Sequence, residues 1–440
     1  MKKIKVKSYI LCIIIILISS PIISSSSVLT DNAQTDTINE LSIQLETNEK
    51  ITQAVENVTE SLLREYLEEL VAIGPRRTGN YGCDIAAEYL YQKFEDMGLE
   101  VRNQKWVVRT SGKRHRLFKS QNIEATLPGT GNSRESIVFN AHYDTVKVSP
   151  GANDDGSGVV AVLAAANVLR HYAFNRTIKF VQFSGEEIGL LGSREYVEEL
   201  YDKNEDVFVE FNADMIGYAE TATGGRNASI SPTEDAEWMI DEIREVNEAY
   251  GINLNIKSRW KLDPNAKRGG SDYYYFVQKG YEALAFWQDE HNPDYWHTPE
   301  DTIEHVNFSY ITNMTKLIVA SLAHTADIEN THPQVQIGAP RRGRLYIEDR
   351  FIREFKYDRT WAIDDFCICV EVKPGDAPIE KVEFYIDGKL KNTDTEIPYQ
   401  WRLNERSLRK HKIKVIAYDE AGRTASDQLN FLHINIRTKE

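Results

Sequence analysis

The sequence predicts an α/β domain followed by a smaller all-β domain. Over residues 53–330, short apolar segments rich in β-branched residues alternate with segments of helical length and periodicity. Such alternation is typical of a sheet covered by helices. After residues 331–340, assigned to a linker, residues 341–440 show short period-two segments closed by turn residues. This second rhythm is typical of a β-sandwich.

The first residues have the features of an export signal. Lysines dominate residues 1–7, and an apolar run of roughly ten residues follows, about half the length that spans a bilayer. Residues 1–27 are therefore predicted to be a cleaved signal peptide, and the polar, aperiodic residues 28–52 a flexible linker. We expect a secreted or cell-surface protein with no stable membrane span after signal cleavage.

The composition fits a globular protein and argues against a nucleic-acid partner. The chain is 41% hydrophobic and has a net charge of −15, whereas binding to phosphate backbones needs clustered Lys and Arg. Beyond the predicted signal, Cys83, Cys367 and Cys369 are too few for a disulfide framework. Either one bridge or inert buried thiols fits this count.

Periodicity places the elements of the α/β domain in order. Amphipathic helices are expected at about 58–73 and 83–97, where Gly74 and Gly98 follow their ends, and a strand at 100–108 comes next. Further strands are expected at 136–141, 177–183, 207–212 and 283–287, and further helices at 157–169, 233–249 and 311–327. Asp155 or Ser157 is expected near the N-cap of the helix at 157–169.

Polar residues follow several of these strands, where open α/β sheets place their ligands. They are His142, Asp154, Glu186, Glu187, Asp214 and His297. Singly, each is more often a structural histidine, a turn or a helix cap. Together, two imidazoles and several carboxylates form a mixed ligand set that suits zinc, and a carboxylate shared by two ions suits a two-metal site. A carboxylate beside the ligands is placed to accept a proton from water.

Six segments in this order resemble the zinc-dependent exopeptidase family of secreted bacterial leucyl aminopeptidases, glutamate carboxypeptidases and glutaminyl cyclases. They are AHYDTV, GANDDGSG, FSGEEIGLLGS, FNADMIGY, GGSDYYYF and YWHTPEDT, and the resemblance covers roughly residues 58–328. It implies a mixed eight-stranded sheet between helices, and a cis peptide after Asp154. This chain has Ser271-Asp272-Tyr273 where many relatives have Ser-Asp-His, which leaves the implied metal ligands intact.

The resemblance also implies a role for each residue of the site. Asp154 bridges two zinc ions, His142 and Asp214 bind one of them, and Glu187 and His297 bind the other. Glu186 is the general base, and Asp144 orients His142.

Other residues of these segments are candidates for contacts with substrate. One of Tyr273, Tyr274 and Tyr275 is a candidate donor to the oxyanion. Trp287 and Trp296 are candidates for the pocket wall. The histidines that fit none of the segments, and are assigned to the surface or the core, are His171, His291, His324 and His332.

The C-terminal residues carry a second resemblance. Strands are expected at 366–372, 381–386 and 412–418, and the segments VEFYIDG, PYQW and HKIKVIAYDEAG resemble immunoglobulin-like modules appended to exported microbial enzymes. The resemblance implies a spacer, surface or substrate-targeting module, and we expect cell-surface contact through it.

These features predict an exported metalloaminopeptidase that hydrolyses peptides with two zinc ions. A zinc carboxypeptidase remains an alternative, with Lys261, Lys267 or Arg268 as the clamp for a terminal carboxylate. A glutaminyl cyclase, which would use a single zinc, and a non-catalytic surface-binding protein are further alternatives. The adjacent Glu186 and Glu187 argue against the binding protein, since a purely structural metal site has no use for a spare base.

Overall fold

The computed structural model describes residues 47–109, 116–131, 133–264, 266–329, 332–355 and 359–436. The predicted signal peptide, residues 1–27, lies outside this set, as does most of the predicted linker at 28–52. Helix α1 (Glu49–Asn57) begins inside that linker: Asn48 accepts a hydrogen bond from Lys50 N, and Ile51 is buried. Residues 49–52 are therefore helical, with the Ile51 side chain in the core. No described helix combines the length and apolar character needed to cross a membrane.

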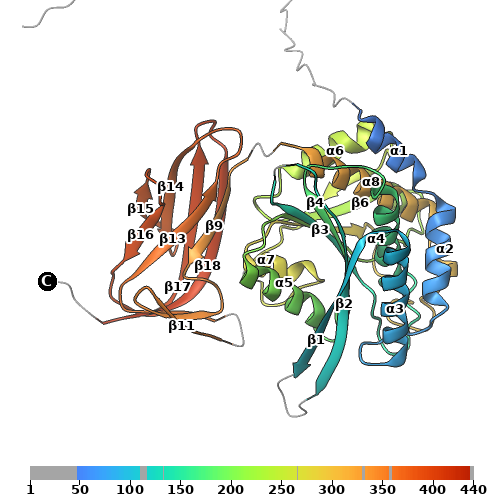
Figure 1. The fold of residues 1–440 in the computed structure, drawn as a ribbon, viewed down its shortest axis with the longest axis horizontal. Coiled ribbons are helices and arrows are strands. Elements are labelled where there is room, and N and C mark those ends of the chain that lie inside the picture. The colour runs from blue at the N-terminus through green and yellow to red at the C-terminus, as the bar shows by residue number, and fades with distance from the viewer. Residues whose placement is uncertain are drawn as a thin grey trace, which may run out of the picture. The chain divides into compact units, whose positions relative to one another are not determined.

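An eight-stranded mixed sheet forms the centre of the first region, in the order β1-β2-β4-β3-β5-β8-β6-β7 (Figure 1). The strands are β1 (Glu100–Arg109), β2 (Leu117–Leu127), β3 (Ser136–His142), β4 (Thr177–Phe183), β5 (Val207–Ala213), β6 (Asn227–Pro232), β7 (Asn255–Ser258) and β8 (Ala283–Gln288). Strands β4, β3, β5 and β8 run parallel, β1 and β2 form an antiparallel edge, and β6 is antiparallel to β8. The expected mixed sheet is confirmed.

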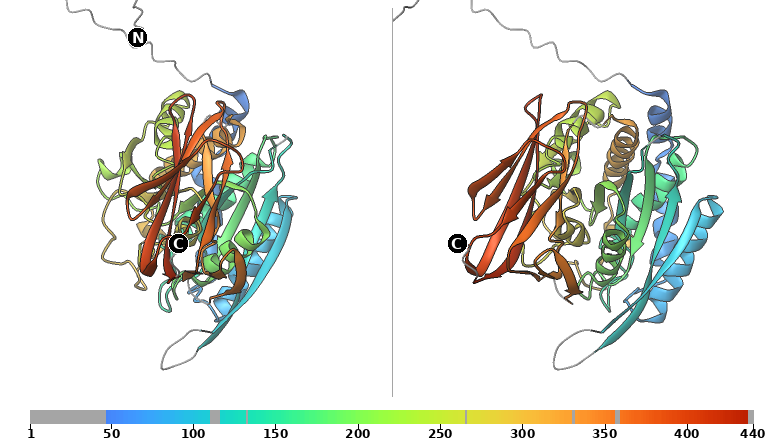
Figure 2. Two further views of the ribbon diagram at one scale, coloured as in Figure 1. Left: turned by 90° about the vertical axis from the view of Figure 1, so that its left-hand side faces the viewer. Right: turned by 60° about the vertical axis from the view of Figure 1, so that its left-hand side comes forward.

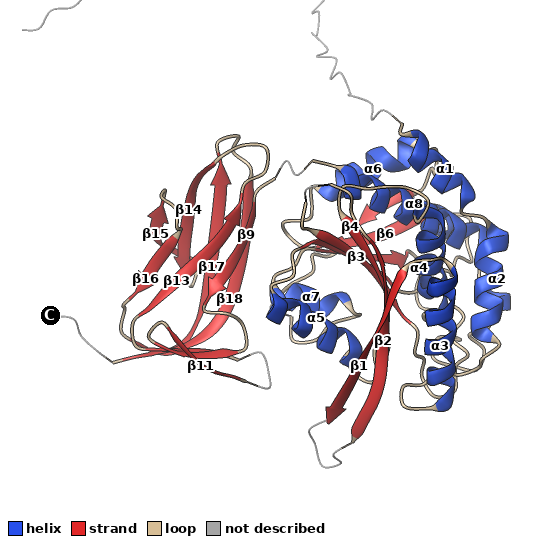
Figure 3. Cartoon of the chain, viewed as in Figure 1, coloured by secondary structure: helices blue, strands red, loops and turns tan. Residues whose placement is uncertain are grey.

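Helices cover both faces of this sheet (Figure 3). One face carries α1, α2 (Glu60–Val71), α3 (Tyr81–Asp96), α4 (Gly156–Leu169), α6 (Met239–Ala249) and α8 (Phe308–Asp327), and the other carries α5 (Leu191–Lys203) and α7 (Tyr273–Lys279). Short 3-10 helices occupy Gly224–Arg226 and Ile303–His305. Helix α4 is buried along nearly its whole length, which explains its apolar sequence.

Helix α6 begins later than expected. The sequence predicts a helix from residue 233, yet α6 starts at Met239. Thr233 Oγ1 accepts a hydrogen bond from Ala283 N, 3.2 Å away at the start of β8. This bond holds the start of the segment before α6 against the sheet.

The C-terminal region is all-β and consists of two sheets that share one apolar core (Figure 2). The larger sheet has the order β11-β10-β12-β18-β17-β14-β15, and the smaller has the order β16-β13-β9. The strands are β9 (Gln334–Ala339), β10 (Arg344–Ile347), β11 (Arg350–Glu354), β12 (Thr360–Ile363), β13 (Phe366–Lys373), β14 (Ile379–Ile386), β15 (Lys389–Asp394), β16 (Gln400–Leu403), β17 (Ser407–Asp419) and β18 (Thr424–Asn435). Ile368 of the smaller sheet and Phe384 of the larger both contribute to that core.

Most of the predicted linker at 331–340 belongs to the all-β region. Residues 334–339 form β9, which pairs antiparallel with β13. Val335 and Ile337 alternate with polar residues, and Ile337 is buried in the shared core. This alternation is a strand pattern, so the assignment of these residues to a linker was wrong.

The three cysteines among the described residues are free thiols. Cys83 is buried, and Cys367 and Cys369 lie on β13 with their sulfur atoms 3.5 Å apart. Of the two alternatives left open by the sequence, the structure shows the one without a bridge.

Candidate metal centre

Donor side chains from several loops meet at the carboxyl ends of the parallel strands. His142 is the last residue of β3, Asp214 follows β5, and the remaining donors lie in loops after β3, β4 and β8. They are Asp154, Glu187 and His297, and all five line one cavity of about 520 Å³. The carboxyl ends of parallel strands meet at one sheet edge, which is why residues far apart in the sequence converge here.

The two carboxylate oxygens of Asp154 face different histidines. Asp154 Oδ1 lies 3.3 Å from His142 Nε2, and Oδ2 lies 2.9 Å from His297 Nε2. Asp214 Oδ1 is 3.8 Å from His142 Nε2, and Glu187 Oε2 is 3.3 Å from His297 Nε2. Ligands of a tetrahedral zinc with bonds of about 2.05 Å are about 3.3 Å apart. The five residues thus form two donor groups that share Asp154.

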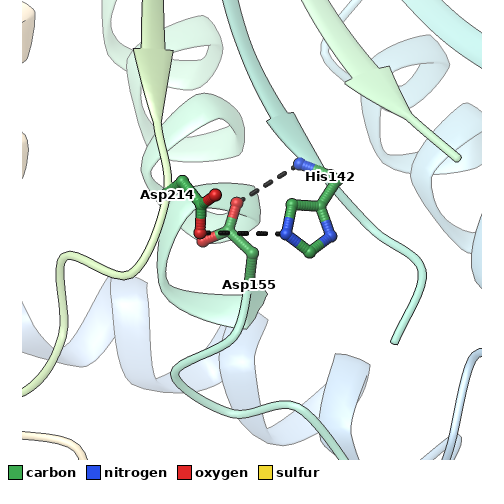
Figure 4. Close-up of side chains that lie close together, drawn as sticks. All are labelled: His142, Asp155 and Asp214. Atoms are coloured by element: carbon green, nitrogen blue, oxygen red, sulfur yellow. Dashed lines mark hydrogen bonds and ion pairs between the residues drawn. The ribbon is translucent and has the colours of Figure 1, made fainter. Parts of the chain in front are cut away.

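Asp155 also lies within reach of His142 and Asp214, but its carboxylate is occupied by backbone donors (Figure 4). Oδ2 accepts a hydrogen bond from His142 N at 3.2 Å, and Oδ1 accepts from Gly158 N at 2.9 Å and Met215 N at 3.1 Å. Asp155 therefore caps α4, as expected, and ties the ends of β3 and β5 together. The cis peptide implied by the resemblance joins Asp154 to Asp155.

The Asp144 carboxylate contacts the turn that carries Glu186 more directly than it contacts His142. The backbone oxygen of Asp144 lies 3.0 Å from His142 Nδ1, while its carboxylate is 3.8 Å from that nitrogen. The carboxylate instead accepts hydrogen bonds from Thr78 Oγ1 at 2.7 Å and Glu186 N at 3.1 Å. The contact expected between this carboxylate and His142 is thus made by the backbone of the same residue.

Glu186 and Glu187 follow β4 in one turn and have different surroundings. Glu187 Oε1 accepts a hydrogen bond from Val146 N at 3.0 Å, which fixes this side chain beside His297. Glu186 lines the same cavity. Burial raises the pKa of Glu186 well above its ordinary value, and the carboxylates of Asp272 and Asp214 act in the same direction, although His142 opposes them.

The centre carries more buried negative charge than its side chains compensate. Burial raises the pKa of Asp144 to about 6 and that of Asp272 to about 7. Burial disfavours the charged form of His142, yet Glu186 and other carboxylates raise its pKa well above the usual value. Unpaired charge in a dry site is costly, and a divalent cation offsets it. Two imidazoles with carboxylates are zinc's donor set, so the residues present fit this metal.

Residues that sequence reasoning missed hold these loops in place. Arg76 is fully buried, and its guanidinium donates to Tyr143 O at 2.8 Å and Gly151 O at 2.9 Å. Asp301 accepts hydrogen bonds from Asn153 N at 2.9 Å and Asp154 N at 3.1 Å. Asp301 lies in the YWHTPEDT segment, which is a usable signal, whereas the segment around Arg76 gives none.

The two tryptophan candidates for the pocket wall lie in the cavity, unlike the tyrosine candidates. Trp287 and Trp296 line the cavity, and Trp296 Nε1 donates to Asp154 Oδ2 at 2.6 Å while its ring stacks on His297. His297 has φ +62°, a left-handed conformation that is uncommon for a non-glycine residue. His291, assigned to the surface or the core, lies in the cavity wall.

The tyrosine candidates do not line this cavity. Tyr273 OH accepts a hydrogen bond from Gly270 N at 3.2 Å, and Tyr274 OH donates to Ala266 O at 2.9 Å. Tyr275 packs beside the apolar cluster around Phe276. From this segment, Gly270 reaches the cavity.

The cationic residues expected to bind the terminal carboxylate in a carboxypeptidase also lie outside the described cavity wall. Lys261, Lys267 and Arg268 are absent from the described wall of the cavity, and Lys261 Nζ pairs with Glu237. Among the described residues, the positively charged Lys or Arg side chain found in that wall is a different one, Arg259, which follows β7. No motif singled it out in the sequence.

Comparisons with known proteins agree with this geometry. The profile of Peptidase family M28 matches residues 122–322. Aminopeptidase YwaD of Bacillus subtilis is 33% identical over 209 residues, which are 46% of this chain and 44% of that protein, so the match spans less than half of the relative's length.

Two solved structures share the fold. The Legionella pneumophila LapA aminopeptidase has a TM-score of 0.54 and 22% identity, covering 66% of this chain and 78% of that one. The zinc aminopeptidase BSAP of Bacillus subtilis has a TM-score of 0.52 and 20% identity, covering 64% and 97%.

Proposed function

We propose that the chain is an aminopeptidase with two zinc ions. Residues 122–322 belong to the zinc-dependent exopeptidases of peptidase family M28, and this membership is the reason for the proposal. The observation that carries this proposal is the pair of donor groups joined at Asp154, with Glu186 in the same cavity. Relatives named as aminopeptidases support the choice within the family.

His142 and Asp214 would hold one ion, His297 and Glu187 the other, and Asp154 both. Bound zinc supplies Lewis acidity, which makes a water more acidic and stabilises negative charge on a substrate oxygen. Glu186 takes a proton from the attacking water and returns it to the leaving amine nitrogen. Burial raises the pKa of Glu186, which makes its carboxylate a stronger base. Asp144 holds the Glu186 turn by accepting the hydrogen bond from Glu186 N.

The acidic wall of the cavity suits the free ammonium group of a peptide. Besides the metal donors, Glu290 lines it. Glu290 is fixed by hydrogen bonds from Glu220 N at 2.6 Å and Thr221 N at 3.0 Å, and these donors lower its pKa although burial opposes them. Such a carboxylate attracts a substrate cation.

The deciding experiment is hydrolysis of one peptide in free, N-acetylated and C-amidated forms, before and after chelation and zinc add-back. An aminopeptidase cleaves the free and amidated forms, loses activity on chelation and regains it with zinc. Glu186→Gln should abolish turnover and keep the metal content of the parent protein. Cleavage restricted to the free and N-acetylated forms would replace this proposal with a carboxypeptidase.

The carboxypeptidase is the second candidate, because Arg259 places a cation in the cavity. A glutaminyl cyclase fits less well, since two donor groups meet at Asp154 and a single zinc needs one of them. A non-catalytic surface-binding protein would leave Glu186 without a task. Zinc binding with no hydrolysis of any peptide form would support it.

We also propose that the protein is secreted or held at the cell surface, with the C-terminal all-β region as an immunoglobulin-like module that contacts the surface. The basic and apolar segments of residues 1–27 support export. Determination of the mature N-terminus from the extracellular fraction tests this, and an intact Met1 there would contradict signal cleavage.

A further inference from the structure

One wall of the cavity is built around a cation. Arg259 follows β7, and its side chain reaches the neighbouring strand, where Nε donates to Ser229 Oγ at 2.9 Å. Its Nη2 pairs with the carboxylate of Asp289. Ser229 lies opposite Trp287 in the β6–β8 register, so Arg259 and Trp287 lie on the same side of the sheet. Arg259, Ser229, Trp287 and Asp289 all line the cavity that holds the metal donors.

Two cations, Lys257 and Arg259, pair with one carboxylate, Asp289, in this small cluster. Asp289 also accepts hydrogen bonds from Lys257 Nζ at 2.6 Å and from Asn227 Nδ2 and Ser229 Oγ, both at 2.8 Å. Burial opposes its charge, but these donors hold the pKa of Asp289 at about 2, so it is an anion. One carboxylate thus receives two cations, and of the two only Arg259 lines the cavity.

Several donors of this wall have no acceptor within the described part of the chain. Arg259 Nη1 has none, although this side chain is 38% exposed. Gln288 is 7% exposed, and its Oε1 accepts from Asn153 Nδ2 and Tyr218 N, both at 3.1 Å, which fixes the amide and leaves Nε2 unpartnered. Trp287 Nε1 is likewise buried and unpartnered. These two ring and amide nitrogens have almost no accessible surface, so a ligand in the cavity does not reach them, whereas the 38% exposed Arg259 side chain is open to one.

We propose that this wall is a subsite for a carboxylate of the substrate, and that Arg259 is the specificity-determining residue. The proposal rests on the proposed peptidase function and deepens it, because it names the substrate class as short peptides that carry a carboxylate away from the bond being cleaved. Arg259 supplies the charged donor for this carboxylate. The carboxylate belongs either to an acidic side chain or to the free C-terminus.

The matched control is Lys257. Lys257 and Arg259 both bind Asp289, so a role limited to holding Asp289 predicts the same effect from Lys257→Gln and Arg259→Gln. A carboxylate subsite predicts an effect from Arg259→Gln alone. Arg259→Lys keeps the charge without the planar fork and should retain part of the preference.

The experiment uses the full zinc-loaded chain and two pairs of peptides, one with Glu or Gln as a side chain and one with a free or amidated C-terminus. For at least one pair, the carboxylate form should show a kcat/KM about 10- to 100-fold higher, mainly through KM. Arg259→Gln should bring the ratio near one, and Lys257→Gln should preserve it. The pair that responds identifies the source of the carboxylate.

Calorimetric binding of the same peptides to Glu186→Gln separates this inference from the proposed function. A carboxylate preference that disappears in Glu186→Gln/Arg259→Gln supports the subsite even if no peptide is hydrolysed. Hydrolysis without any carboxylate preference overturns the subsite and leaves the peptidase intact. Equal loss of preference in the Arg259 and Lys257 variants also overturns it, because the effect would then act through Asp289.

Discussion

The two donor groups of the metal centre differ in how deeply they are built into the fold. His142 is 1% exposed, stands at the end of a central strand, and has a backbone N–H bonded to the cap of α4. His297 is 36% exposed, lies in a loop, and has a left-handed backbone with a tryptophan stacked on its ring. Burial and backbone ties prepare the first group before any metal arrives. The second group remains open to solvent and substrate.

The largest effect is expected from the residue that the two groups share. Asp154→Ala should remove both metal ions and lower kcat/KM by more than about 100-fold, because even supporting residues of metal sites cause losses approaching that size. Metal content by mass spectrometry and peptide hydrolysis measure the two effects. Glu290→Gln, in the same cavity wall but bonded elsewhere, is the control and should keep both ions. Retention of either ion by Asp154→Ala would show that this donor group does not depend on Asp154.

Substitution of the two histidines should change stability by different amounts but metal content by the same amount. His142→Ala leaves buried carboxylates without their counter-charge, so the free energy of unfolding of metal-free protein should fall by about 3 kcal/mol. His297→Ala should change it by less than about 1 kcal/mol, because that side chain is partly solvated. Each variant should lose one ion. Denaturant unfolding with metal analysis provides the readout, and equal destabilisation would show that the depth of burial does not matter.

The two ions should also leave in order. With a competing chelator in graded amounts, the ion at His297 should dissociate first, at a chelator concentration about 10-fold lower. The His297→Ala variant should lack the early phase, and the His142→Ala variant should keep it. Release of both ions in one step would contradict a difference in metal affinity between the two donor groups.

A smaller effect is expected from the support of the general base. Thr78→Val removes the donor to Asp144 and loosens the carboxylate that holds Glu186 N. We expect kcat to fall about 10-fold while metal content is unchanged. Thr59→Val, at the cap of α2, is the matched threonine control and should leave kcat as it is. A loss of metal in Thr78→Val would assign Thr78 to the ligands instead.

The smallest effect concerns a buried carboxylate that is already paired. Glu124 accepts hydrogen bonds from Arg102 at 2.8 Å and Tyr196 at 2.6 Å, and these outweigh burial and lower its pKa. A depressed pKa stabilises the fold above the unfolded value, and this stability is lost as pH falls through the folded value. Acidification below about pH 4.3 should therefore cost on the order of 1 kcal/mol, and Glu124→Gln should flatten that dependence in urea unfolding of metal-free protein.

Sequence reasoning predicted the strands whose buried faces read as apolar runs. β3, β4, β5 and β8 are of this kind, and the polar residues at their ends gave the metal donors. The strand β2 escaped prediction because Lys119, Gln121 and Glu124 interrupt its apolar pattern. β6 escaped because its sequence, NASISP, is mostly polar, and β7 has too few residues for a period. Arg259 and Arg76 were missed for a related reason, since their roles depend on contacts between distant segments.

The spread of the donors from His142 to His297 has a consequence for how the protein matures. No short stretch of the chain holds both imidazoles with Asp154 between them, so an incomplete chain offers no full set of ligands. Acquisition of the second ion must then follow folding through the loop after β8, which carries His297. Misincorporation of other metals is accordingly decided where folding finishes, and by the metals available there.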